Sequence, residues 1–142
     1  EPSSVDLDPV TQDAWKLSEL KRGICWLCHE TSAEFLPQML GFDQLGAVNY
    51  RKGCYPGQEI VARTHYLGKV KRHPRLLSSS AKVCPAPLDK IQILSGNEQF
   101  DAVVVDCVNI EGGVSELFCV TRMGPDMVAE KIKYLDQVHP VS

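Results

Sequence analysis

Residues 52–63 read Lys52-Gly53-Cys54-Tyr55-Pro56-Gly57-Gln58-Glu59-Ile60-Val61-Ala62-Arg63. Pro56 suits the first position of a helix, because its missing N–H would have no partner there in any case. If Tyr55 caps that helix, the amide of Gln58 can reach back to the cap backbone. The pattern therefore predicts a helix over residues 56–65, and Gly68 is the residue expected to close it.

The predicted helix has two distinct faces. Glu59 and Arg63 are four residues apart, which allows them to pair on a polar face. The other face is expected to pack inward, and it holds four residues: Gly57, Ile60, Val61 and Thr64.

Cys54 lies just before this helix and two residues from Lys52. The positive end of the helix dipole and the lysine charge both favour the thiolate over the thiol. Gly53 and Gly57 remove two Cβ atoms near the sulfur, which allows a tight turn or the close approach of a ligand. An isolated cysteine is more often a small buried residue at a strand–helix junction. The surrounding block favours a functional thiol instead.

The block resembles the signature of the YgfZ-type folate-binding proteins, which are relatives of the glycine-cleavage T-protein, an aminomethyltransferase. Mitochondrial iron–sulfur assembly factors of the same family carry a similar Lys-Gly-Cys-Tyr-x-Gly-Gln-Glu run. Three flanking stretches are similar to that family as well: residues 34–40, 45–48 and 66–72. The close resemblance runs from about Trp15 to Arg72. The remainder resembles only loosely the carboxy-terminal β-barrel of the family.

The resemblance implies an α+β fold that is mostly β. Residues 1–74 would be the carboxy-terminal part of a folate-binding domain, with the Lys-Gly-Cys motif on a short helical and strand segment. Residues 75–142 would form a small antiparallel β-barrel. The sequence does not begin with Met, and such proteins usually carry a further amino-terminal domain. That domain is expected to supply much of the folate pocket.

The function implied by the resemblance is that of a helper protein rather than a self-contained enzyme. It would bind tetrahydrofolate and support the assembly or repair of iron–sulfur clusters. In bacteria it would also support tRNA modification through an iron–sulfur enzyme. Its partners would be iron–sulfur proteins or their assembly machinery, with no membrane. Its compartment would be the bacterial cytoplasm, or the mitochondrial matrix in a eukaryote.

The site residues follow from the motif. Cys54 is expected to be the functional thiol and is the residue assigned to catalysis. Lys52 and Arg63 are expected to meet anionic parts of the folate. No metal ligands are assigned. The other positions assigned to cofactor binding are Gly53, Tyr55, Gly57, Gln58 and Glu59.

Two alternatives remain open. One is a folate-dependent aminomethyltransferase like the T-protein. The other is an RNA-binding module, because residues 51–75 hold seven basic groups and one acid. That window carries +6 while the whole chain carries −3, which leaves −9 elsewhere. Such a field suggests an anionic partner. Tyr55 and Tyr66 are the aromatic residues of the window, too few for confident base stacking, so direct nucleic-acid binding is not expected.

The amino-terminal half predicts short, mixed elements. Residues 15–20 are expected to be extended or mixed, and residues 45–50 form a strand candidate. Thr31 and Glu34 have the spacing of a helix-capping box, and Pro37 should end or interrupt that turn.

After Pro74 the sequence predicts a series of short strands. Four β-rich runs, separated by turn signals, cover residues 75–83, 90–94, 100–110 and 114–121. Residues 126–135 are ambiguous between helix and strand. The regular spacing of these runs is typical of a small antiparallel barrel.

Six cysteines stand at positions 25, 28, 54, 84, 107 and 119. Without an export signal they are expected to be reduced, with Cys84 in a loop and Cys107 and Cys119 in the core. The run from Cys25 to His29 matches the attachment pattern of c-type haem. No haem is expected, because no export signal and no second axial ligand are visible. Zinc or redox roles for Cys25 and Cys28 are weaker alternatives to two core thiols.

Overall fold

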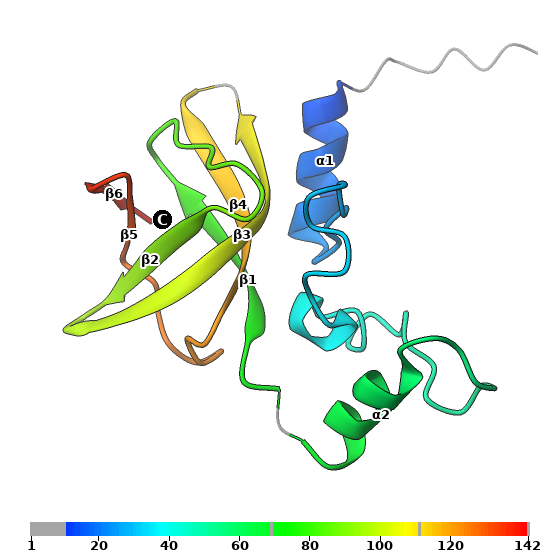
Figure 1. Cartoon of the computed structure of the whole chain (residues 1–142). Coiled ribbons are helices and arrows are strands. Elements are labelled where there is room, and N and C mark those ends of the chain that lie inside the picture. The colour runs from blue at the N-terminus through cyan, green and yellow to red at the C-terminus, as the bar shows by residue number, and fades with distance from the viewer. Residues whose placement is uncertain (1–10, 69, 111, 142) are drawn as a thin grey trace, which may run out of the picture.

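The computed structural model describes residues 11–68, 70–110 and 112–141. A group of helices lies beside a curled sheet (Figure 1). In chain order the elements are α1 (Gln12–Lys21), the 3-10 helix η1 (Pro37–Leu40), α2 (Gln58–Tyr66), β1 (His73–Ser79), β2 (Lys90–Ser95), β3 (Glu98–Ile110), β4 (Val114–Thr121), β5 (Lys131–Tyr134) and β6 (Gln137–Pro140). The prediction of an α+β fold that is mostly β is confirmed.

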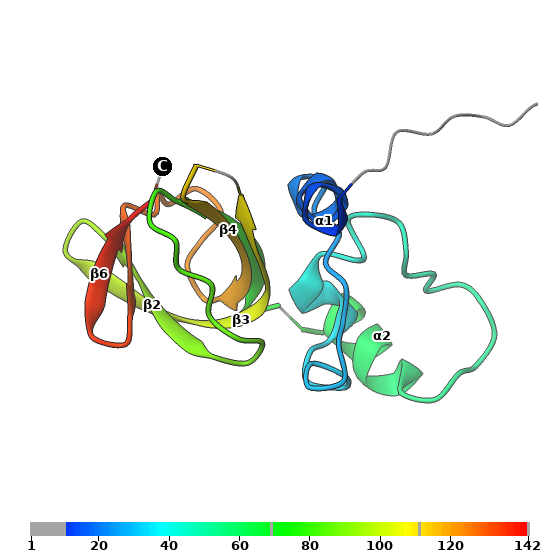
Figure 2. The same ribbon diagram turned by 90° about the horizontal axis from the view of Figure 1, so that it is seen from above.

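The six strands form one antiparallel sheet in the order β1-β4-β3-β2-β5-β6. Figure 2 shows how this sheet curls around its own interior. One isolated bridge, between Ser79 and Val141, connects the strand at one edge to the chain just after β6. No continuous ladder closes the sheet in the described parts of the chain, so the closed barrel remains a prediction.

The strand predictions are largely confirmed. The first of the four β-rich runs begins slightly earlier than expected, at His73, and its strand ends at Ser79. The ambiguous segment 126–135 contains strand β5 and no helix. Leu135 and Asp136 follow β5 with φ angles of 48° and 59°, and this left-handed pair turns the chain directly into β6.

The inner face of the sheet carries the larger hydrophobic core. These side chains are buried because alternate residues of each strand point to the same face. The core consists of Leu77, Ile91, Ile93, Ala102, Val104, Cys107, Leu117, Cys119, Met123 and Ile132.

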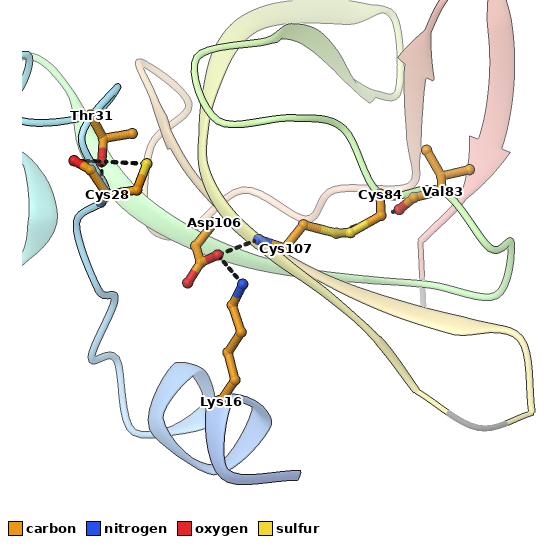
Figure 3. Close-up of polar contacts among 7 residues, drawn as sticks. All are labelled: Lys16, Cys28, Thr31, Val83, Cys84, Asp106 and Cys107. Atoms are coloured by element: carbon orange, nitrogen blue, oxygen red, sulfur yellow. Dashed lines mark hydrogen bonds and ion pairs between the residues drawn. A yellow bond between two sulfur atoms is a disulfide. The ribbon is translucent and has the colours of Figure 1, made fainter. Parts of the chain in front are cut away.

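A β-bulge in β3 changes this alternation. Val104 pairs with Cys119 and Asp106 pairs with Phe118, so Val105 is the extra residue. Val104 belongs to the inner core, whereas Val105 packs in a second cluster on the outer face. Asp106 also lies on the outer face, where it forms an ion pair with Lys16 of α1 (Figure 3). The bulge therefore directs two successive side chains towards the helices.

The second cluster holds the helical segment on the outer face of β3 and β4. It joins residues of α1, the segment after α1, η1 and the sheet: Leu20, Cys25, Leu40, Val105, Val108, Phe118 and Val120. The segments expected to be separate domains thus share a hydrophobic core. The boundary between residues 74 and 75 remains a prediction.

Two expectations for the amino-terminal half are wrong. Residues 15–20 are part of helix α1, whose first turn is capped by the Thr11 hydroxyl accepting from the Ala14 N–H at 3.2 Å. Residues 45–50 form no strand. The Gly46 N–H bonds the Asp43 carbonyl at 3.1 Å and the Ala47 N–H bonds the Phe42 carbonyl at 2.8 Å. These local turns use the backbone groups that a ladder would need.

The capping box at Thr31 is also not formed as expected. The Glu34 N–H does close a turn on the Thr31 carbonyl at 3.3 Å, but the Thr31 hydroxyl accepts from the Cys28 N–H at 2.9 Å. Pro37 begins η1 rather than ending a helix, because the fixed φ of proline suits a first helical position. Within the described ranges, no helix has both the length and the apolar character to cross a bilayer.

The second cluster predicts a strong dependence of stability on Leu20, which is buried. We expect Leu20→Ala to lower the free energy of unfolding by about 2–5 kcal/mol, because it removes buried methyl groups and leaves a cavity. Urea denaturation followed by circular dichroism measures this change. Leu67→Ala is the matched control, since Leu67 is 84% exposed. Equal, small losses from both substitutions would contradict this packing of α1.

Candidate functional site

The Lys-Gly-Cys motif forms an exposed loop that leads into α2. The side chains of Lys52 and Cys54 are exposed, and that of Tyr55 is half-buried. Lys52 Nζ lies 4.8 Å from the centre of the Tyr55 ring, a distance at which a cation is attracted to the ring face. The thiol is therefore presented to solvent from a loop in which the Lys52 cation lies over the Tyr55 ring.

Gly57 determines where α2 begins. Its φ of 81° is left-handed, and it serves as the N-cap. The helix therefore begins at Gln58 instead of Pro56, since a left-handed residue cannot belong to a right-handed helix. The expected reach of Gln58 back to Tyr55 is confirmed: the Gln58 Oε1 accepts from the Tyr55 N–H at 3.2 Å.

The end of α2 and the space around Gly53 also agree with the motif. The Gly68 N–H bonds the Arg63 carbonyl at 3.1 Å, just past the last helical residue, Tyr66. A Cβ added at Gly53 or at Gly57 would meet no other atom within 4 Å. Both positions therefore face open space, in which a larger side chain would also fit.

Helix α2 packs through a narrow contact. Val61 is buried, and its carbonyl accepts from Gln38 Nε2 of η1 at 2.7 Å. Ile60, which was expected to face inward, is 60% exposed. The inward face is thus limited to Val61, with Thr64 half-buried beside it. Most of the helix surface remains free to meet another molecule.

The polar face of α2 does not form its expected internal pair. Glu59 and Arg63 are both exposed, and no ion pair joins them in this part of the structure. The Arg63 guanidinium is therefore available to an outside anion.

An aromatic cluster lies beside the motif. The Tyr50 ring stacks on the His65 ring, with centres 3.7 Å apart and an angle of 13° between the planes. Tyr66 contacts both rings edge-on, with centres 6.2 Å from Tyr50 and 4.8 Å from His65. The position of Tyr50 could not be predicted from the sequence, because the turns that bring it to α2 have no periodic pattern. The His65 ring is therefore engaged with Tyr50.

Polar atoms gather under the cluster. Burial raises the pKa of Tyr50, and the nearby Asp43 carboxylate raises it by a smaller amount. The side-chain amide of Gln38 opposes this rise. The Tyr50 hydroxyl, Gln38 Oε1 and Asp43 Oδ1 are buried without a hydrogen-bond partner of normal geometry in the described structure. Two of these atoms can only accept, so the set suits a group that carries N–H donors.

Two cysteines correct the expectation of six reduced thiols. Cys84 and Cys107 form a disulfide, with Cα atoms 5.6 Å apart (Figure 3). The loop after β1 is tied to β4 through the Ser115 hydroxyl, which accepts from the Val83 N–H at 3.0 Å and lies 3.0 Å from the Ala81 carbonyl. A sequence pattern could not show that a loop cysteine would lie opposite a strand cysteine.

Cys25 and Cys28 occupy different environments. Cys25 is buried, and this burial, together with the Asp106 charge, raises the pKa of its thiol to about 11. Cys28 Sγ lies 3.3 Å from the Thr31 hydroxyl (Figure 3). In the ranges that the structure describes, no group of three or more His, Cys, Asp or Glu side chains is arranged to hold a metal ion.

The environments of the free thiols predict an order of alkylation. Burial raises the pKa of Cys119 to about 12, so Cys25 and Cys119 should stay protonated and unlabelled by iodoacetamide at neutral pH. Cys54 is exposed and should be labelled first. Peptide mass spectrometry over a pH series measures this order. Labelling of Cys25 as fast as that of Cys54 in the folded protein would contradict these positions.

Comparison with known proteins identifies relatives along much of the chain. No family model matches it. A tRNA-modifying protein YgfZ of Colwellia psychrerythraea is 44% identical over 66 residues, which cover 46% of this chain and 20% of that protein. A tRNA-modifying protein YgfZ of Escherichia coli is 31% identical over 117 residues, or 80% of this chain and 36% of that protein. The chain thus spans about a third or less of the length of these relatives. On this similarity, the chain belongs to the YgfZ-type family.

Proposed function

We propose that this chain presents the reactive thiol of a folate-binding helper protein that supports tRNA modification. The observation that carries the proposal is the exposed position of Cys54 in the motif loop, two residues after Lys52 and four residues before α2 begins. The relatives are named tRNA-modifying proteins, which supports the role in tRNA modification. We further propose that this support acts through the assembly or repair of iron–sulfur clusters.

The residues around Cys54 fit the chemistry of a folate. Lys52 and Arg63 are exposed cations that could bind the carboxylates of the glutamate tail. The buried acceptors Gln38 Oε1 and Asp43 Oδ1 suit the N–H donors of a pterin ring. Tetrahydrofolate, when bound, supplies a carrier for one-carbon groups. Because the motif loop is exposed, we propose that the rest of the pocket comes from a part of the protein outside this chain.

Each motif residue then has a defined task. Gly57 sets the start of α2, and Gln58 fixes the backbone of Tyr55. The Tyr55 ring holds the Lys52 cation near the loop. Gly53 leaves the approach to Cys54 open, and Glu59 lies on the exposed face of α2. As a thiolate, Cys54 can act as a nucleophile or as a ligand for a transient metal ion. This role belongs in the compartment where tRNA is modified, which is the cytoplasm in bacteria or the mitochondrial matrix in a eukaryote.

The proposal predicts that Cys54→Ala abolishes function in cells while leaving the fold intact. The substitution removes an exposed sulfur, so the free energy of unfolding should change by less than about 0.5 kcal/mol. The measurement is the fraction of modified nucleosides in tRNA, by mass spectrometry, in cells that lack their own YgfZ-type protein and receive the complete protein. Cys28→Ser is the matched control, since Cys28 is half-buried outside the motif. Full tRNA modification with Cys54→Ala would refute the role of the thiol.

A further inference from the structure

The basic residues of the window 51–75 fall into two groups: one that is bonded within the protein and others that are exposed to solvent. Arg75 is used internally, because its guanidinium donates to the carbonyls of Gly124 and Met127. Lys69 lies outside the described residues. The other five basic residues are exposed and form no ion pair within the described structure: Arg51, Lys52, Arg63, Lys71 and Arg72. Most of the local positive charge is therefore free to meet an anion.

Three of these cations belong to the two segments whose aromatic rings meet at the exposed Tyr66. Tyr66 is 65% exposed, and Arg63 lies three residues before it on α2, hence on the same side of the helix. Arg51 and Lys52 directly follow Tyr50, whose ring contacts Tyr66. Tyr55, under the Lys52 ammonium, also lies close enough to Tyr50 to help raise the pKa of its hydroxyl. We call Arg51, Lys52, Arg63 and Tyr66 the Tyr66 face.

Stacking fixes the aromatic part of this face. Tyr50 and His65 cover one another, and both support Tyr66 edge-on. The Tyr66 ring is thus held in place while most of its surface is open to solvent. An exposed ring of this kind, beside several cations, suits a nucleic-acid base with its phosphates. A glutamate tail would need the cations but not the ring.

We infer that the Tyr66 face binds single-stranded RNA, with a base on Tyr66 and phosphates on Arg51, Lys52 and Arg63. The inference rests on the proposed role in tRNA modification, which makes tRNA the RNA expected in cells. It departs from the expectation that direct nucleic-acid binding is absent. That expectation rested on two aromatic residues, Tyr55 and Tyr66. In the folded chain, the rings of Tyr50 and His65 also lie against Tyr66. Glu59 is the acid on the same exposed side of α2 and should weaken phosphate binding.

The test is fluorescence anisotropy of a labelled single-stranded RNA of about 12 nucleotides with the complete protein. Tyr66→Ala should weaken binding by about 5- to 150-fold, while Tyr66→Phe should bind like the original protein. Arg63→Gln should reduce the slope of log affinity against log salt by about 0.7. Glu59→Gln should tighten binding. Circular dichroism confirms that each variant is folded.

Matched controls lie elsewhere on the surface. Trp26→Ala removes a ring that is also exposed, and Lys131→Gln removes an exposed cation on β5. Neither should alter the affinity for RNA. Either the absence of saturable RNA binding or an unchanged affinity in folded Tyr66→Ala would overturn the inference. Cys54→Ala should bind RNA normally, so a failure of the proposed thiol function would leave this result intact.

Discussion

The β-bulge at Val105 is the constraint on which the arrangement of this molecule depends. Without the extra residue, strict alternation would send Asp106 to the inner face of the sheet. With the bulge, Val105 packs against the helices and Asp106 pairs with Lys16. One irregular residue in a long strand thus gives the outer face both an apolar and a charged contact with α1.

The motif depends on this contact through a short chain of interactions. The outer cluster contains Leu20 of α1 and Leu40 of η1. From η1, the Gln38 amide donates to the Val61 carbonyl of α2. Helix α2 then carries the left-handed Gly57 and the loop with Cys54. The sheet therefore positions the thiol without contributing side chains to the motif, and α2 keeps an exposed face for ligands.

Elements with strong local patterns could be predicted from the sequence. The β-rich runs after Pro74 and the Tyr55–Gln58 hydrogen bond of α2 follow from alternation and capping chemistry. Helix α1 could not be predicted from the sequence, because its apolar residues show little helical periodicity. Tertiary contacts were beyond the local pattern: the disulfide of Cys84 with Cys107 and the stack of Tyr50 on His65 join segments that only the fold brings together.

We propose that the motif loop is the part of this chain that meets a folate. The most direct measurement is a titration of tetrahydrofolate into the complete protein, followed by intrinsic tryptophan fluorescence, with Lys52→Gln and Arg63→Gln variants alongside. We expect saturable binding that both substitutions weaken, and much weaker binding by the chain of residues 1–142 alone. Absence of saturable binding by the complete protein, or binding unaffected by either substitution, would contradict this proposal.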